Sequence, residues 1–155
     1  YRAQRTKQTI GIILSDIDKF KKINDSYGHL IGDFVLKEFT KRIRNNCREY
    51  DFIGRYGGDE FIVCLPNTNI QQSLIVAKRI QEAILKQDFI YQDCNIPITG
   101  SFGVNALENF NSILEKKDSD HIIKEILEKT DVSLYDAKKN GRNQIKFPER
   151  IENNG

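Results

Sequence analysis

Two acids follow two glycines in the stretch Arg55-Tyr56-Gly57-Gly58-Asp59-Glu60-Phe61, which carries the most chemistry in the chain. Paired glycines ahead of a β-prone run predict a tight hairpin turn. Glycines also have no side chains, so a bulky ligand could lie against the backbone. Asp59 and Glu60 would stand at the rim of a sheet, where carboxylates can hold a divalent cation. Taken alone, the stretch is also typical of an ordinary hairpin with solvated acids.

A second charged group follows the apolar strand expected at residues 10–15. Asp16 ends that strand, and Asp18 comes shortly after it. The next residues include three lysines, Lys19, Lys21 and Lys22. Mg²⁺ usually takes one or two protein carboxylates together with substrate phosphates, and two such ions can clamp both oxygens of a phosphoryl transfer. The group therefore favours a metal-bound polyphosphate, with a strand-ending acid and a solvated helix face as the alternative.

Two further pairs could contact a nucleotide. Asn24 and Asp33 offer a carboxamide and a carboxylate, which together can satisfy the donor and acceptor edge of a guanine. Their alternative interpretation is a turn asparagine and an acid at the start of a helix. Lys138 and Arg142 would contact phosphates if the end of the last helix folds over the site, and would otherwise complement the helix dipole.

The composition predicts one soluble domain, residues 1–155, with a core at about 10–147. Hydrophobic residues make up 39% of the 155 residues and charged residues 30%, which is ordinary for a globular protein. No apolar run approaches the ~20 residues of a membrane span, and no signal peptide is visible. The net charge of +2 argues against nucleic-acid binding. The isolated Cys47, Cys64 and Cys94 predict reduced thiols in the cytoplasm, neither a disulfide framework nor a zinc site.

Periodicity predicts strands alternating with helices. The predicted strands cover residues 10–15, 52–65 as a hairpin, 96–104 and 144–147. The predicted helices follow Gly32-Asp33, begin at Asn69, and cover about 123–137, with 105–119 as a loop or short helix. Hairpins mixed with crossover helices indicate an α+β fold of the ferredoxin-like type.

Six blocks of the chain, in order, resemble the GGDEF domain of bacterial diguanylate cyclases. They are residues 16–25, 27–29, 32–33, 55–61, 101–104 and 134–143. The resemblance implies a nucleotidyl cyclase or polymerase palm, a mainly antiparallel five-stranded sheet flanked by helices. It also implies that two GTP molecules condense into cyclic di-GMP and two pyrophosphates. Each GTP would sit on one of two facing subunits, so the partner would be a second GGDEF domain in a homodimer.

Residue roles follow from the same resemblance. The metal ligands, for two Mg²⁺ per GTP with Mn²⁺ as the alternative ion, would be Asp16, the Ile17 carbonyl, Asp59 and Glu60. Asp16, Asp59, Glu60 and Lys21 would be catalytic. The residues that bind the substrate would be Phe20, Asn24, Asp33, Gly57, Gly58, Lys138 and Arg142. Asn24 and Asp33 would read the base, and Asp33 favours plain guanine specificity.

The resemblance adds a product-binding inhibitory site. Arg48 and Asp51 match the family's RxxD motif, and Arg79 on the following helix is a second contact. Arginine can grip a phosphate bidentately or stack on a purine, as feedback binding of cyclic di-GMP requires. The alternative is an exposed ion pair that contributes little.

Two departures from the family pattern qualify these expectations. The chain begins after the position of the family's D-x-L-T-G-L-x-N-R turn, so weak GTP binding is expected. The segment 105–119 is also longer than the family minimum. The chain has no Met, which indicates a piece of a longer protein; an N-terminal regulatory domain is expected, and membrane attachment is left open. The other functions considered are a catalytically silent module that senses GTP or cyclic di-GMP, and a polymerase palm, which the near-neutral charge disfavours.

Overall fold

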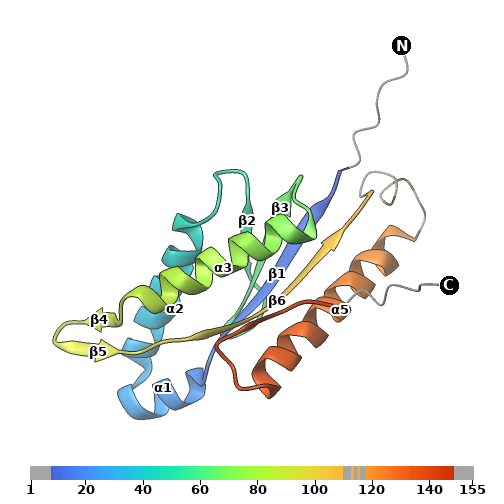
Figure 1. The fold of residues 1–155 in the computed structure, drawn as a ribbon. Coiled ribbons are helices and arrows are strands. Elements are labelled where there is room, and N and C mark those ends of the chain that lie inside the picture. The colour runs from blue at the N-terminus through green and yellow to red at the C-terminus, as the bar shows by residue number, and fades with distance from the viewer. Residues whose placement is uncertain (1–7, 110–112, 114, 116–117, 149–155) are drawn as a thin grey trace.

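The computed structural model describes residues 8–109, 113, 115 and 118–148. Its centre is a five-stranded sheet in the order β2-β3-β1-β6-β7 (Figure 1). The strands are β1 Ile10–Ile17, β2 Phe52–Arg55, β3 Glu60–Pro66, β6 Gly100–Leu107 and β7 Ile145–Lys146. All neighbours pair antiparallel except β6 and β7, which are parallel. The predicted palm-type fold is therefore confirmed.

Helices cover both faces of the sheet (Figure 1). They are α1 Phe20–Tyr27, α2 His29–Asn45, α3 Ile70–Lys86 and α5 Ser119–Lys139. Successive strand residues point to opposite faces, and the face with Ile13 and Val63 packs into the core with α2 and α3. On the other face, α5 lies so close to Gly103 that a Cβ there would come 2.5 Å from the carbonyl oxygen of Thr130.

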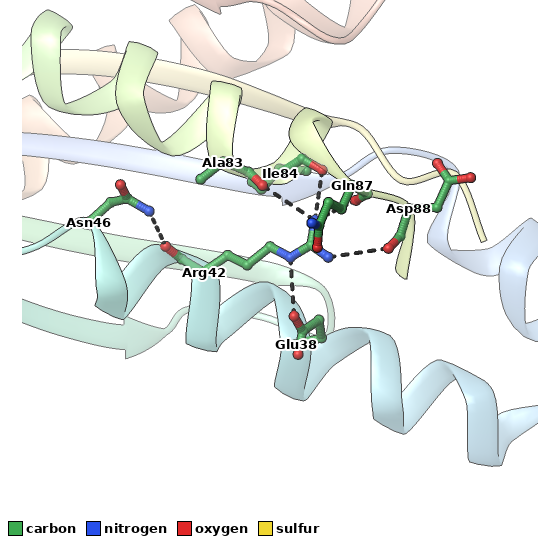
Figure 2. A network of polar contacts seen from close by, with 7 residues as sticks. All are labelled: Glu38, Arg42, Asn46, Ala83, Ile84, Gln87 and Asp88. Atoms are coloured by element: carbon green, nitrogen blue, oxygen red, sulfur yellow. Dashed lines mark hydrogen bonds and ion pairs between the residues drawn. The ribbon is translucent and has the colours of Figure 1, made fainter. Parts of the chain in front are cut away.

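One arginine joins the two helices of the first layer (Figure 2). The Arg42 guanidinium donates to the carbonyl oxygens of Ile84 at 2.9 Å and Gln87 at 2.7 Å, with a longer bond to Ala83 at 3.3 Å. These carbonyls lie at the C-terminal end of α3, where the last carbonyl oxygens of a helix have no N–H donors within the helix. The guanidinium also bonds to Glu38 at 3.1 Å and lies 4.0 Å from the centre of the Phe89 ring. Arg42 therefore caps a helix that is distant in sequence.

The prediction of one strand at 96–104 is wrong. The short β5, Cys94–Ile96, pairs with β4, Phe89–Tyr91, in a separate two-stranded sheet, and β6 begins only at Gly100. Pro97 lies between them and cannot donate a ladder hydrogen bond, which separates β5 from β6.

Two other boundaries differ from the prediction. Helix α2 starts at His29, before Gly32-Asp33, because Gly28 with φ 88° ends α1 and begins α2 in one step. Strand β6 continues to Leu107, so the predicted loop 105–119 is shorter at its start. Its residues 110–112, 114 and 116–117 lie outside the described part of the chain.

The predicted start of α3 and end of α5 are confirmed. Asn69 forms the cap of α3 in a capping box with Gln72, and α5 ends at Lys139. Cys47, Cys64 and Cys94 are free and half-buried. Among the described residues, no helix is long and apolar enough to cross a membrane.

Candidate active site

The sheet register brings the predicted acids together at one end of β1. Asp16 is paired with Glu60 on β3 and with Ser101 on β6. The Ile17 backbone N–H donates to the Asp59 carbonyl oxygen at 3.2 Å, which places the hairpin beside the strand end. The Asp59 carboxyl group lies close enough to that of Asp16 to raise its pKa, and Asp16 is 6% exposed. Local strand pairing alone thus gathers three carboxyl groups.

Lys138 reaches these acids from the last turn of α5. Its ammonium pairs with Asp16 Oδ2 and lies 3.8 Å from Glu60 Oε1. Burial opposes the ammonium charge, but the hydrogen bond and charge of Asp16, with the charges of Glu60 and Asp59, outweigh it and raise the pKa of Lys138. The end of α5 therefore lies over the site, which was the condition for the expected phosphate contacts, and in this structure Lys138 contacts carboxylates.

The acid cluster contains an oxygen without a hydrogen-bond partner, which could bind a cation. Asp16 Oδ1 is buried and has no hydrogen-bond partner. Burial, followed by the neighbouring Asp59 carboxyl group, raises the pKa of Asp16 to about 7, against the opposing effect of Lys138. Among the described residues no group of three or more His, Cys, Asp or Glu is arranged to hold a metal. Mg²⁺ needs only one or two carboxylates when phosphates supply other oxygens, so Asp16 and Asp59 are adequate donors.

Asn24 packs against Gly32, the residue that precedes Asp33 on α2. A Cβ on the buried Gly32 would lie 1.8 Å from Asn24 Oδ1, so the asparagine side chain rests directly on the α2 backbone next to Asp33. The two predicted base-reading residues therefore belong to one surface formed by α1 and α2. Phe20 and Lys21 lie in the first turn of α1, with Lys21 exposed.

Sequence reasoning missed an apolar pocket beside this surface. About 310 Å³ of space lies between α2 and β2, lined by Leu36, Ile53 and Phe61 among others. Leu36 lies one turn after Asp33 on α2, so the pocket adjoins the base-reading pair. The sequence signal for this pocket was Leu36, which lies beside the main apolar stripe of its helix. Such a position is more simply interpreted as a core residue.

The hairpin glycines supply space without unusual backbone angles. Positive φ among the described glycines occurs at Gly28 and Gly141, not at Gly57 or Gly58. A Cβ on Gly58 would meet nothing within 4 Å. The Arg55 guanidinium donates to the Gly57 and Gly58 carbonyl oxygens at 3.2 and 3.0 Å and fixes the turn. The open surface over Gly58 can accept a ligand.

Asp18 has a structural role and does not belong to the metal-binding group that its position after Asp16 suggested. Its carboxylate accepts hydrogen bonds from Thr99 Oγ1 at 2.6 Å, from Ser101 Oγ at 2.5 Å and from the Asn143 backbone N–H at 2.9 Å. It therefore ties β1 to β6 and to the turn that contains Arg142. Nothing in the sequence marked Asp18 as saturated, because its partners lie 81 to 125 residues away.

The predicted inhibitory residues surround one turn between α2 and β2. Asp51 is buried, and its Oδ2 accepts from the Arg48 backbone N–H at 2.7 Å. The Arg48 guanidinium instead bonds to the Tyr50 hydroxyl at 2.8 Å. Arg79 donates to the Asn46 carbonyl oxygen at 2.7 Å. The exposed ion pair considered as the alternative does not form, so Asp51 shapes the turn and leaves the Arg48 side chain exposed.

Comparisons with known proteins identify the family. The family described as "Diguanylate cyclase, GGDEF domain" matches residues 1–144, and the chain belongs to it. Diguanylate cyclase A of Treponema denticola is 42% identical over 90% of this chain and 35% of its own length. The response regulator PleD of Caulobacter vibrioides is 36% identical over 93% of this chain and 30% of its own length. The chain thus spans about a third of these relatives.

Solved structures agree with the assignment. The active GGEEF domain of a diguanylate cyclase from Vibrio cholerae superimposes with a TM-score of 0.77, at 34% identity over 92% of this chain and 85% of that one. The GGDEF domain of DgcB from Caulobacter crescentus, in complex with c-di-GMP, gives a TM-score of 0.76, at 27% identity over 90% of this chain and 78% of that one.

Proposed function

We propose that this domain condenses two GTP molecules into cyclic di-GMP with release of two pyrophosphates. The observation that carries the proposal is the buried Asp16 Oδ1 without a hydrogen-bond partner, next to Asp59 and facing Glu60. Asp51 also has a buried oxygen without a partner, but it lies within a turn, whereas Asp16 lies beside two further carboxyl groups. The family's curated relatives include proteins named diguanylate cyclase, which supports the same reaction here.

The chain's residues divide the work by position. Asp16 and Asp59, helped by the Ile17 carbonyl and Glu60, would hold Mg²⁺, which when bound supplies positive charge to the phosphate oxygens. Lys138 pairs with the carboxylates in this structure. With their negative charge neutralised by the metal, it would instead contact the triphosphate. Lys21 and Arg142 would add phosphate contacts.

The base would be recognised by α1 and α2. The Asp33 carboxylate would accept from the guanine N–H groups, and the Asn24 carboxamide would complete the pattern of donors and acceptors. Leu36, Ile53 and Phe61 would cover a face of the ring in the adjoining pocket. Gly57 and Gly58 would leave room for the nucleotide between the hairpin and the helices.

The reaction requires two copies of the domain. Each site would place one GTP so that its 3′-hydroxyl attacks the α-phosphate of the other, and pyrophosphate leaves from each. The catalytic partner is therefore a second GGDEF domain in a homodimer. We also propose that a regulatory domain of the longer protein controls this pairing.

The test is incubation with GTP and Mg²⁺ at high protein concentration, with detection of cyclic di-GMP and pyrophosphate. Asp59→Asn should abolish product while the thermal unfolding midpoint stays close to wild type. Absence of both products from a sample shown to be dimeric would exclude the cyclase. Binding of cyclic di-GMP with no release of pyrophosphate would show a silent sensor instead.

We further propose product inhibition through Arg48 and Arg79, with Asp51 as the residue that shapes their turn. Both arginine side chains are exposed and border the same turn, and the DgcB domain is described in complex with c-di-GMP. Arg48→Ala should weaken binding of cyclic di-GMP and relieve inhibition. Inhibition unchanged in this variant would remove Arg48 from the site.

A further inference from the structure

Gln81 is a polar side chain on the core-facing side of α3. It lies one turn from Ala77 and Ile84, which pack into the apolar core, and it is 7% exposed. Its Nε2 donates to the Asn143 carbonyl oxygen at 2.9 Å and lies 3.4 Å from Asn143 Oδ1. Burial of a carboxamide costs free energy unless it forms hydrogen bonds, so the bond to Asn143 explains how the core accommodates a glutamine here.

This bond holds the turn that leads from the end of α5 to β7. The Asn143 backbone N–H donates to the Asp18 carboxylate at 2.9 Å, and the Asn143 carbonyl oxygen accepts from Gln81. The backbone N–H of Arg142, the preceding residue, donates to the Ala137 carbonyl oxygen at 2.9 Å. The turn is therefore bonded to three separate segments, which are the end of β1, α3 and α5.

Two consecutive residues of the turn have a left-handed backbone. Arg142 has φ 62° and Asn143 has φ 48°, a conformation that costs free energy for residues other than glycine and persists only where surrounding contacts hold it. The bonds from Asp18 and Gln81 act on the two peptide groups that flank the Asn143 Cα. Together they fix both backbone angles of Asn143, and without Gln81 one of these peptide groups could rotate.

We propose that Gln81 is a positioning residue for Arg142. By keeping the turn left-handed, Gln81 fixes the direction in which the exposed Arg142 side chain leaves the backbone. The inference rests on the proposed function, in which Arg142 contacts the triphosphate of GTP. Gln81 itself would touch neither nucleotide nor metal, because its carboxamide is buried and bonded to the turn.

The test is the affinity of the full chain for 3′-deoxy-GTP with Mg²⁺, measured by calorimetry. This nucleotide lacks the attacking hydroxyl, so it binds without reacting. Gln81→Met keeps the size of the side chain and removes the donor, and it should weaken binding about fivefold. Arg142→Ala should weaken binding about tenfold, the loss expected for one charge-assisted contact. Gln71→Met, the same change at an exposed position of α3, should leave the affinity unchanged.

Two double variants separate positioning from a general loss of structure. Adding Gln81→Met to Arg142→Ala should cost no further affinity, because no arginine side chain remains to be positioned. Adding Asn143→Gly to Gln81→Met should restore the affinity to within about twofold of wild type, because glycine adopts the left-handed conformation readily. A loss caused by general destabilisation would persist in both double variants.

Equal affinities of wild type and Gln81→Met would overturn the proposal, as would no binding of 3′-deoxy-GTP by wild type. A loss that adds to that of Arg142→Ala, or that Asn143→Gly fails to restore, would also overturn it. Formation of cyclic di-GMP from GTP is assayed separately. If no cyclic di-GMP forms while the binding results hold, the cyclase proposal fails and the positioning role stands. If cyclic di-GMP forms and the binding results do not hold, the positioning role fails alone.

Discussion

The acid cluster at the end of β1 and the Arg42 clamp between α2 and α3 both bury charge, but they use it differently. The Arg42 side chain is 12% exposed, and its guanidinium bonds to carbonyl oxygens along the end of α3 and to Glu38 (Figure 2). The Asp16 side chain is slightly more buried, at 9% exposed, yet one of its oxygens has no partner. The fully bonded Arg42 is structural. The unpartnered oxygen of Asp16 lies among other carboxyl groups, where a ligand could use it, whereas the unpartnered oxygen of Asp51 lies within a turn.

The largest effect should come from Asp16→Asn. Turnover should fall by about 10³-fold, because the charge of a metal ligand is lost where negative charge develops on phosphate. The free energy of unfolding should change by less than about 1 kcal/mol, since a poorly satisfied buried charge is also removed. Parallel assays of cyclic di-GMP formation and urea unfolding in metal-free buffer would check both. If Asp16→Asn lowered the free energy of unfolding by as much as it raised the activation free energy, Asp16 would be structural like Arg42.

Arg42→Ala should give the opposite pattern. It leaves the carbonyl oxygens at the end of α3 without donors and removes the contact with Phe89, so unfolding should become easier by about 3 kcal/mol. Urea unfolding monitored by circular dichroism measures this. Lys41→Ala, at the exposed neighbouring position, should stay within about 0.5 kcal/mol of wild type. An Arg42→Ala protein as stable as that control would show that the clamp is not needed.

These two groups also show what local sequence can and cannot predict. The strand ending at Asp16, the glycine hairpin and the Asn69 cap each depend on a few adjacent residues, and all could be predicted. Arg42 looked like any helical arginine, because its carbonyl partners lie 41 to 46 residues away. The β4–β5 hairpin was missed for another reason: each strand has three residues, too few to show a period.

Asp18→Asn tests whether a carboxylate with fully used hydrogen-bonding capacity is structural even when it lies next to the candidate site. An amide keeps one acceptor oxygen and places an NH₂ group where donors now point, so about 2 kcal/mol of stability should be lost. The measurement is urea unfolding beside Asp16→Asn and the exposed control Asp25→Asn on α1. We expect the order of stability to be Asp25→Asn, Asp16→Asn, then Asp18→Asn. If Asp16→Asn were the least stable, an unpartnered oxygen would be no guide to function.

The smallest effect should come from Gly32, which acts by leaving room for the Asn24 side chain. In Gly32→Ala the new Cβ would lie 1.8 Å from Asn24 Oδ1, so the half-buried asparagine side chain must leave its position against α2. GTP affinity should fall about tenfold, as expected when one base contact is lost. Stability should change little, because alanine favours the helix by about 1 kcal/mol and offsets the clash.

A double-mutant cycle with Asn24→Ala isolates this mechanism. If Gly32 acts only by seating Asn24, adding Gly32→Ala to Asn24→Ala should cost no further GTP affinity. ITP lacks the exocyclic amine that Asp33 would bind, so wild type and all three variants, which retain Asp33, should still prefer GTP to ITP. Independent, additive losses from the two substitutions would mean that Gly32 affects the pocket by another route, and that the carboxamide is not held in place for the base.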